Sequence, residues 1–119
     1  MAKYQSQGNS VRTKRPRIRL VGGLKPIFYR QVLAGTKDVE SRFRIRRDKL
    51  LDSLEPGDEL VLYCNGKPEA SRCKVLGTTL WESETERHRY YYGIGIKLIE
   101  VVSWPREGRR QGIAEIPPA

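Results

Sequence analysis

The chain is poor in the side chains that bind metals and catalyse acid–base chemistry. It has one histidine, His88, and two cysteines, Cys64 and Cys73, in 119 residues. Two cysteines without CxxC spacing or partner histidines make a poor metal site. The sequence contains no GxSxG, HExxH or phosphate-loop motif, and the G-I-G stretch at 93–95 lacks the third glycine of a dinucleotide-binding loop. We therefore expect neither a cofactor nor a bound metal.

Long apolar runs are also missing. No stretch approaches the ~20 residues that cross a bilayer, and the N-terminus lacks the apolar segment of a signal peptide. With 38% apolar and 31% charged residues, the composition is typical of a soluble globular protein with one core. We expect a cytoplasmic protein that binds no membrane, with a monomer favoured.

In a reducing cytosol the two cysteines should stay as buried or half-buried free thiols. The alternative is a cross-strand disulfide, because a hairpin turn centred near Pro68 would set Cys64 nearly opposite Cys73.

Acidic residues are absent from the first 19 positions, which contribute +6 of the net charge of +9. A stretch rich in Gly, Ser and Gln cannot bury a core, but its cations can release counterions from a nucleic acid. We expect residues 1–16 to be a disordered basic arm, and Arg15 and Arg17 to contact nucleic acid. The alternative is a solvated leader that only aids solubility.

Strand-like segments dominate the remaining sequence. Residues 17–21 alternate charged and apolar side chains, and Gly22-Gly23 predicts a turn after them. Gly77 is a candidate bulge, and Gly93 and Gly95 would let a long strand coil sharply. Further strands are predicted at 59–64, 72–80, 90–102 and 112–116, with a loop or short helix at 81–88 and a loop of more than two residues after Asn65-Gly66.

A helix is predicted before residue 35, followed by a charged strand. Pro26 suits the first helical turn, and Gly35 suits a left-handed helix end. Beyond it, residues 37–44 alternate with the two-residue period of a strand, which gathers Glu40, Arg42 and Arg44 on one face. The predicted apolar stripe of the helix comprises Leu24, Phe28, Tyr29, Val32 and Leu33.

A basic cluster follows this strand. It precedes leucines that predict a short helix within residues 44–54, whose apolar side would cover one end of the core. The basic side would face solvent or a ligand. Its cations are Arg44, Arg46, Arg47 and Lys49, and its leucines are Leu50, Leu51 and Leu54.

The order Lys25, Gly35, Lys37, Glu40 and Arg42, followed by P-G-D at 56–58, resembles the signature of the ASCH domains. In that family a lysine-containing helix start precedes a G-x-K-x-x-E-x-R motif. The family consists of compact β-barrels related to the PUA RNA-binding fold, and the resemblance covers roughly residues 18–104. It implies an α+β, mainly β fold at 17–119: an antiparallel or mixed barrel of about five or six strands with one to three short helices.

The resemblance also implies a cleft between helix and barrel beside this motif. Lys37 and Glu40 point to opposite sides of an ideal strand, so they meet only if Lys37 stays in the turn after Gly35. We expect RNA binding there, with an unpaired or modified nucleotide held near Lys37, Glu40 and Arg42; single-stranded DNA and a free modified nucleoside are alternatives. A surface ladder of paired charges is the simpler interpretation. Further binding candidates are Lys25, Arg44, Arg46 and Arg47.

Three consecutive tyrosines at 90–92 must alternate between the faces of a strand. At least one should be outside, and Tyr91 is the candidate for stacking on a base. Trp81 and Trp104 could do the same. For each ring taken singly, core packing is the alternative.

One branch of the ASCH-like proteins looks like an amidohydrolase that deacetylates N4-acetylcytidine with a lysine, a threonine and a later glutamate. Lys37 matches the lysine, whereas Glu40 stands where that branch has its threonine. The later acid would be Glu82, Glu84 or Glu86. The alternative function is therefore a nucleoside- or RNA-acting hydrolase, either an amidohydrolase or a ribonuclease, that uses Lys37, Glu40 and Glu82. A protein-interaction module with a basic arm is a third class.

Overall fold

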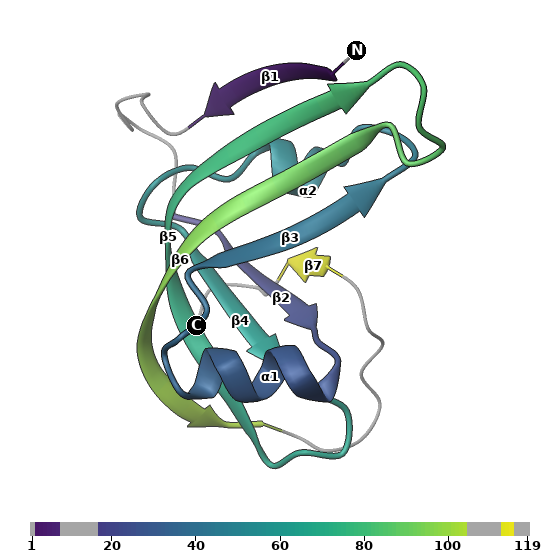
Figure 1. The fold of residues 1–119 in the computed structure, drawn as a ribbon. Helices are drawn as coiled ribbons and strands as arrows, with labels where there is room; N and C mark the ends of the chain where they lie inside the picture. The colour runs from purple at the N-terminus through teal and green to yellow at the C-terminus, as the bar shows by residue number, and fades with distance from the viewer. Residues whose placement is uncertain (1, 8–16, 105–112, 116–119) are drawn as a thin grey trace.

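The structure is a computed structural model that describes residues 2–7, 17–104 and 113–115. Strands predominate in these ranges, and two short helices join them (Figure 1). The elements are β1 (Ala2–Gln7), β2 (Arg19–Gly23), α1 (Pro26–Leu33), β3 (Val39–Arg44), α2 (Lys49–Asp52), β4 (Glu59–Tyr63), β5 (Glu69–Ser83), β6 (Tyr90–Ser103) and β7 (Ile113–Glu115).

All the described strands belong to one mixed sheet. Its order is β3-β6-β5-β4-β2-β7, with β1 paired to β5 beside this path. The β2–β4 pair is parallel and the other pairs are antiparallel. One half of β5 pairs with β4 and the other half with β1, so the two long strands β5 and β6 run through both halves of the sheet (Figure 1).

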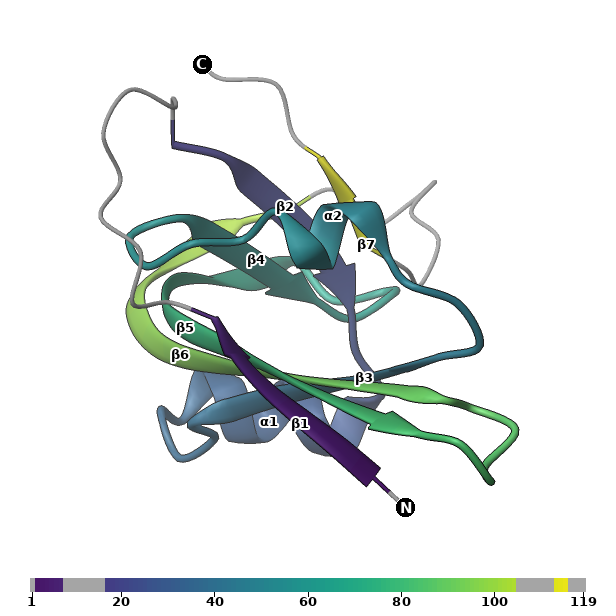
Figure 2. The same cartoon turned by 90° about the horizontal axis from the view of Figure 1, so that it is seen from above.

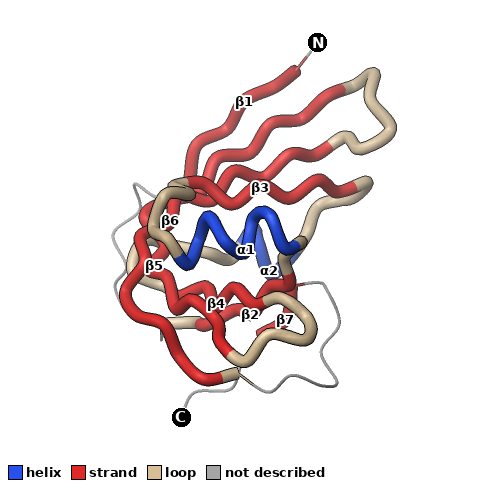
Figure 3. Tube along the Cα trace, turned by 60° about the horizontal axis from the view of Figure 1, so that its bottom comes forward, coloured by secondary structure: helices blue, strands red, loops and turns tan. Residues whose placement is uncertain are grey.

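The predicted α+β, mainly β fold with short helices is confirmed, but a closed barrel is not. Among the described residues, β3 and β7 each pair with one neighbour, so backbone hydrogen bonds leave the sheet open. The long strands curve strongly (Figure 2). Helix α1 lies between the half of the sheet that carries β3 and the half that carries β2 and β4 (Figure 3). The open edges of the sheet are therefore β3 and β7, and the side chain of Arg42 on β3 reaches across the open seam to Gly23 at the end of β2.

The main core fills the concave side of the curved sheet. Removing this apolar surface from water is the chief favourable contribution to folding. Both helices add side chains to it: Tyr29 and Val32 from α1, and Leu51 from α2. The sheet contributes Leu20, Leu60, Leu62, Val75, Leu80, Tyr92, Ile94 and Ile96.

Helix α1 begins and ends as the sequence predicts. Pro26 occupies its first turn, where a missing N–H leaves no hydrogen bond unmade. Gly35 has φ 73° and follows the last turn, where its N–H donates to the Val32 carbonyl at 3.0 Å. The predicted stripe is only partly correct. Phe28 is 42% exposed because it lines a surface cleft, described below, and not the core.

The helix predicted within 44–54 is shorter than expected. Asp48 caps it by accepting from the backbone N–H groups of Leu50 and Leu51, which fixes its start at Lys49. Residues 45–48 are therefore a loop. Leu51 and Leu54 are buried, as predicted.

Three other boundaries differ from the predictions. Gly22 and Gly23 remain in β2 because they pair with Leu62 and Tyr63, so no turn forms there. Strand β5 continues to Ser83, which leaves a loop over 84–89. Within the segment expected to be a disordered arm, Ala2–Gln7 is described as strand β1, and residues 8–16 lie outside the described residues.

The predictions at Gly77 and at both cysteines are confirmed. The register of β5 against β6 shifts between Val75 and Gly77, which is the expected bulge. Cys64 and Cys73 are buried free thiols. The disulfide alternative is wrong, because Cys73 lies opposite Leu60. Neither helix of the described residues has the length and apolar character that a membrane span requires.

Candidate functional site

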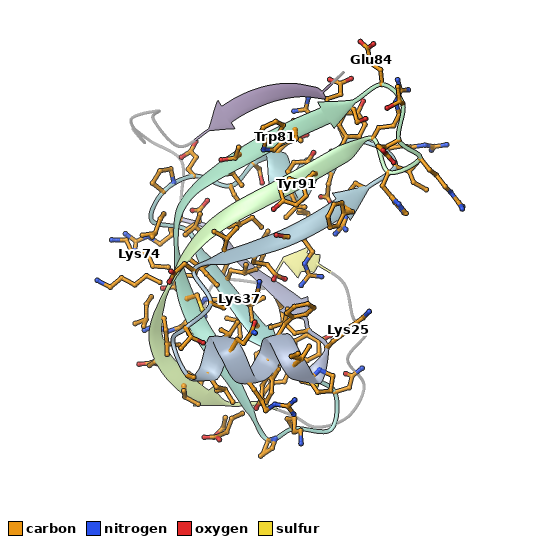
Figure 4. All side chains as sticks on the ribbon, in the orientation of Figure 1. Lys25, Lys37, Lys74, Trp81, Glu84 and Tyr91 are labelled. Atoms are coloured by element: carbon orange, nitrogen blue, oxygen red, sulfur yellow. The ribbon has the colours of Figure 1, made fainter. Side chains whose placement is uncertain are left out.

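A cleft of about 530 Å³ opens at the seam between β3 and the β2–α1 junction. It contains four of the five residues that precede the P-G-D segment in the ASCH-like pattern; the fifth, Gly35, ends the helix that borders it. Lys37 lies between the sheet and α1, and Lys25 lies at the start of that helix (Figure 4). The lining residues are Gly23, Leu24, Lys25, Phe28, Lys37, Glu40, Ser41, Arg42 and Phe43.

Glu40 is the buried acid of this cleft, with 3% of its surface exposed. Its Oε2 accepts a hydrogen bond from Arg42 Nε at 2.8 Å and forms an ion pair with Arg42 Nη2 at 2.5 Å. Its Oε1 lies 3.6 Å from Lys37 Nζ. Lys37 precedes β3 in the turn after Gly35, so the condition for Lys37 and Glu40 to meet is fulfilled. Two cations share one buried carboxylate.

Arg42 also bridges the open seam of the sheet. Its Nη2 donates to the carbonyl oxygen of Gly23 at 3.0 Å, which joins edge strand β3 to the end of β2. The guanidinium is thus fixed on two sides in a planar fork. Its Nη1 has no partner among the described residues, which leaves donors for a ligand in the cleft.

Lys37 is held by three groups. Its Nζ donates to the Val39 carbonyl at 2.5 Å, pairs with Glu40, and lies 5.2 Å from the centre of the Phe28 ring. A cation above an aromatic face is stabilised by the ring quadrupole. These contacts suit a fixed ammonium group that meets an anion or a polar base edge.

A second hollow, of about 750 Å³, lies beside the loop that follows β3. Its lining includes the four basic residues of the predicted cluster, one carboxylate, Asp48, and His88. Arg44 donates to Asp48 at 2.9 Å, while Arg46 is exposed and has no ion pair among the described residues. We call residues 44–49 the arginine loop.

A buried tyrosine anchors the arginine loop. Tyr92 Oη donates to Asp52 at 2.9 Å and accepts from the Asp48 backbone N–H at 3.0 Å. Burial raises the pKa of Tyr92, which therefore stays a neutral donor. Arg47 hydrogen-bonds Asp52 at 2.9 Å, and this bond raises the pKa of Arg47. Two cations of the loop are thus held, and Arg46 stays available.

Other predicted residues lie away from the cleft. Glu82 pairs with Tyr90 near the hairpin end of β5, whereas Lys37 precedes the opposite end of β3, so Glu82 does not line the cleft. Glu84 lies at the tip of the β5–β6 hairpin (Figure 4), and Glu86 is exposed in the same loop. Arg17 is exposed, and Arg15 lies outside the described residues.

Five cleft residues were not predicted as site residues from the sequence: Gly23, Leu24, Phe28, Ser41 and Phe43. Phe28 fits the apolar period of α1, which favoured the core. Ser41 and Phe43 alternate with Glu40 and Arg42, so the two-residue period assigns them to the opposite face. Ser41 and Phe43 can still line the cleft because β3 is an edge strand, which has a neighbour on one side only. In the sequence, the charges of Glu40 and Arg42 were the only sign that β3 borders a site.

Comparisons of the chain with protein-family models, with curated proteins and with solved structures found no match. The fold and the cleft define a small α+β protein with a curved mixed sheet.

Proposed function

We propose that this protein binds RNA through an ASCH/PUA-like domain, with an unpaired or modified nucleotide held in the cleft at the seam. The observation that supports it is the convergence of Lys25, Lys37, Glu40 and Arg42 on one cleft of about 530 Å³. A space of this size is in the range of small-ligand pockets.

Each cleft residue has a distinct role in this proposal. Lys25 is exposed and supplies a charge to a phosphate at the rim. Lys37 Nζ and Arg42 Nη1 donate to the base edge or to a phosphate. Glu40 holds both cations in place, because it is buried between them. A fixed set of donors pays less ordering entropy on binding than mobile lysines on a surface would.

The arginine loop would hold the phosphate backbone that flanks the bound nucleotide. Phe43 lines both the cleft and the second hollow, so the two are contiguous. Arg46 is the cation best placed to take a phosphate, since Arg44 and Arg47 already pair with Asp48 and Asp52. Arg44 and Arg47 would add to the positive potential.

Hydrolysis of an acylated nucleoside or of RNA is the competing function. The observation in its favour is that Lys37, the candidate nucleophile, lines the cleft. A nucleophilic lysine needs a base to take its proton. Glu40 is the only carboxylate among the described lining residues, and it already accepts a hydrogen bond from Arg42 Nε and pairs with Arg42 Nη2. We therefore favour binding without turnover.

The test compares three variants that each replace one lysine by glutamine, inside the cleft or outside it. Lys25→Gln and Lys37→Gln remove cleft cations, and Lys74→Gln removes an exposed cation that is absent from the cleft lining (Figure 4). We expect each cleft variant to weaken binding of a short single-stranded RNA and to lower the slope of log Kd against log salt by about one. Lys74→Gln should leave both close to the wild-type values.

The same samples separate binding from hydrolysis. Equal affinities for the three variants would overturn the cleft as the RNA site. Release of acetate from N4-acetylcytidine, or cleavage of the labelled RNA, that is lost in Lys37→Gln would favour the hydrolase.

A further inference from the structure

Three aromatic side chains form a row across the outer face of the sheet. Phe43 on β3 is the register partner of Tyr91 on β6, and Tyr91 is the partner of Trp81 on β5. Residues directly opposite each other in antiparallel strands point to the same face. Trp81 and Tyr91 lie side by side on neighbouring strands (Figure 4). We call Phe43, Tyr91 and Trp81 the aromatic row.

The rings of this row are held and accessible. Phe43 is 57% and Trp81 42% exposed. The Tyr91 hydroxyl is 2.9 Å from Ser41 Oγ, and the ring centres of Tyr91 and Phe43 are 4.9 Å apart. A ring already fixed by its neighbours loses little freedom when a ligand stacks on it.

Glycines make the sheet concave beside the row. A hollow of about 460 Å³ lies over Gly77, Gly93 and Gly95, and its described lining is uncharged. A Cβ at Gly93 would touch the Tyr91 ring at 3.6 Å, so the ring leans over this glycine. The result is an uncharged hollow, walled by Tyr91 and Trp81, beside the aromatic row.

The row is continuous with both basic hollows. Phe43 contacts Tyr91 on the outer face and also lines the cleft and the hollow beside the arginine loop. An RNA strand that leaves the cleft over edge strand β3 would meet Phe43 and then Tyr91 of the aromatic row. Cations therefore lie on one side of an uncharged aromatic surface, which is the arrangement that single-stranded nucleic acids recognise.

We infer that the aromatic row is a stacking platform for the unpaired bases that follow the nucleotide in the cleft. This inference rests on the proposed function and extends it, since it assigns the ligand as a single strand several nucleotides long. The basic side chains of the two adjoining hollows favour a polyanion over an apolar protein as the ligand of the row. The β5–β6 loop is not the source of this charge, because Glu84 and Glu86 offset Arg87 and Arg89 there.

The experiment measures binding of a uridine RNA of about eight nucleotides to the full chain. Phe43→Leu and Trp81→Leu remove one ring each and keep an apolar side chain, and Ile99→Ala truncates an exposed side chain of β6 outside the row. Each row variant should weaken binding about tenfold without changing the salt slope, because stacking releases no counterions. Ile99→Ala should bind as the wild type does.

Two further readouts test the bases themselves. In a Trp104→Phe background Trp81 is the only tryptophan, and its fluorescence should be quenched when the RNA binds. An abasic strand of equal length should bind at least as weakly as RNA binds to the row variants, because it loses every stacked base and also the base held in the cleft.

The outcomes separate this inference from the proposed function. Wild-type affinity in both row variants, with binding weakened by Lys37→Gln, would overturn the platform and leave the cleft. Equal binding of abasic strand and RNA would also overturn it. Self-association that the row variants abolish, with no effect on RNA affinity, would assign the row to contact with a second copy. Absence of RNA binding by the wild-type chain would overturn both proposals.

Discussion

Glu40 is the residue that holds two of the three cleft cations, Lys37 and Arg42, in place. Replacing it by glutamine removes the counter-charge from Arg42 and Lys37, whose side chains are 13% and 14% exposed. We expect Glu40→Gln to lower the free energy of unfolding by about 2–3 kcal/mol, because two largely buried cations lose their partner. Denaturant titration measures this loss.

Glu100→Gln is the matched control for this prediction. Glu100 also pairs with an arginine, Arg72, but at 3.4 Å and with 54% of its side chain exposed. Solvent-exposed pairs contribute little, so the control should change stability by less than about 0.5 kcal/mol. Equal losses in the two variants would show that burial of Glu40 does not matter.

Cys73 should make stability depend on alkaline pH. Burial raises the pKa of this thiol from 9.0 to about 11, and the charge of Glu40 adds to the effect. The folded state therefore keeps its proton at a pH where the unfolded chain loses it. The contribution is complete below about pH 9 and is lost as pH rises toward 11, by up to about 2.5 kcal/mol.

The measurement is the difference in unfolding free energy between the wild type and Cys73→Ala across this pH range. Taking the difference cancels the tyrosines, which titrate in the same interval. The gap between the two proteins should shrink from pH 9 to pH 11. A constant gap would mean that the buried thiol does not titrate differently in the folded chain.

Helix α1 delivers Lys37 to the cleft through the left-handed residue at its end. Gly35 has φ 73°, and the nearest atom to an added Cβ is 4.0 Å away, so conformation and not crowding decides the effect of a substitution. Gly35→Ala should cost about 1–2 kcal/mol of stability. It should also weaken RNA binding, because the turn that carries Lys37 would rearrange.

Gly35→Asn provides the control, since asparagine adopts the left-handed conformation more readily than alanine. Thermal unfolding should rank the proteins as glycine, then asparagine, then alanine. The reverse order of the two variants would argue that the strain lies elsewhere.

The sequence alone predicted the elements better than their arrangement. The ends of α1, the strands β3, β4 and β6 and the bulge at Gly77 follow from local rules of proline, glycine and two-residue alternation. The capping of α2 by Asp48 shortened a helix that propensity alone would extend. Pairing of Gly22 and Gly23 with β4 is a long-range contact, and no local pattern encodes it.

The site was predicted in part for the same reason. Residues on one face of a single strand, Glu40 and Arg42, can be grouped by period alone. The exposure of Phe28 and the proximity of Ser41 and Phe43 to the cleft depend on β3 being an edge strand, which only the topology decides. Glu82 lay outside the cleft because its distance from Lys37 is set by strand register.

In the part of the chain that the structure describes, the sheet is open, and the side chain of Arg42 spans its seam. Arg42 connects β3 to Gly23 and thereby sets the width of the cleft. Arg42→Lys keeps the net charge of +9 but loses the planar fork that reaches Glu40 and Gly23 together. We expect amide hydrogen exchange to quicken in β3 by about tenfold, since an edge strand without this clamp opens more easily.

RNA affinity should fall in Arg42→Lys although the charge is unchanged, because the donors of the cleft lose their fixed spacing. The salt slope should stay near its wild-type value, since the number of cations is the same. Lower RNA affinity with the wild-type salt slope would show that Arg42 supports binding through its geometry and not only through its charge. Wild-type affinity and exchange would mean that the charge at residue 42 is sufficient, and that the sheet does not need the clamp to hold its cleft in shape.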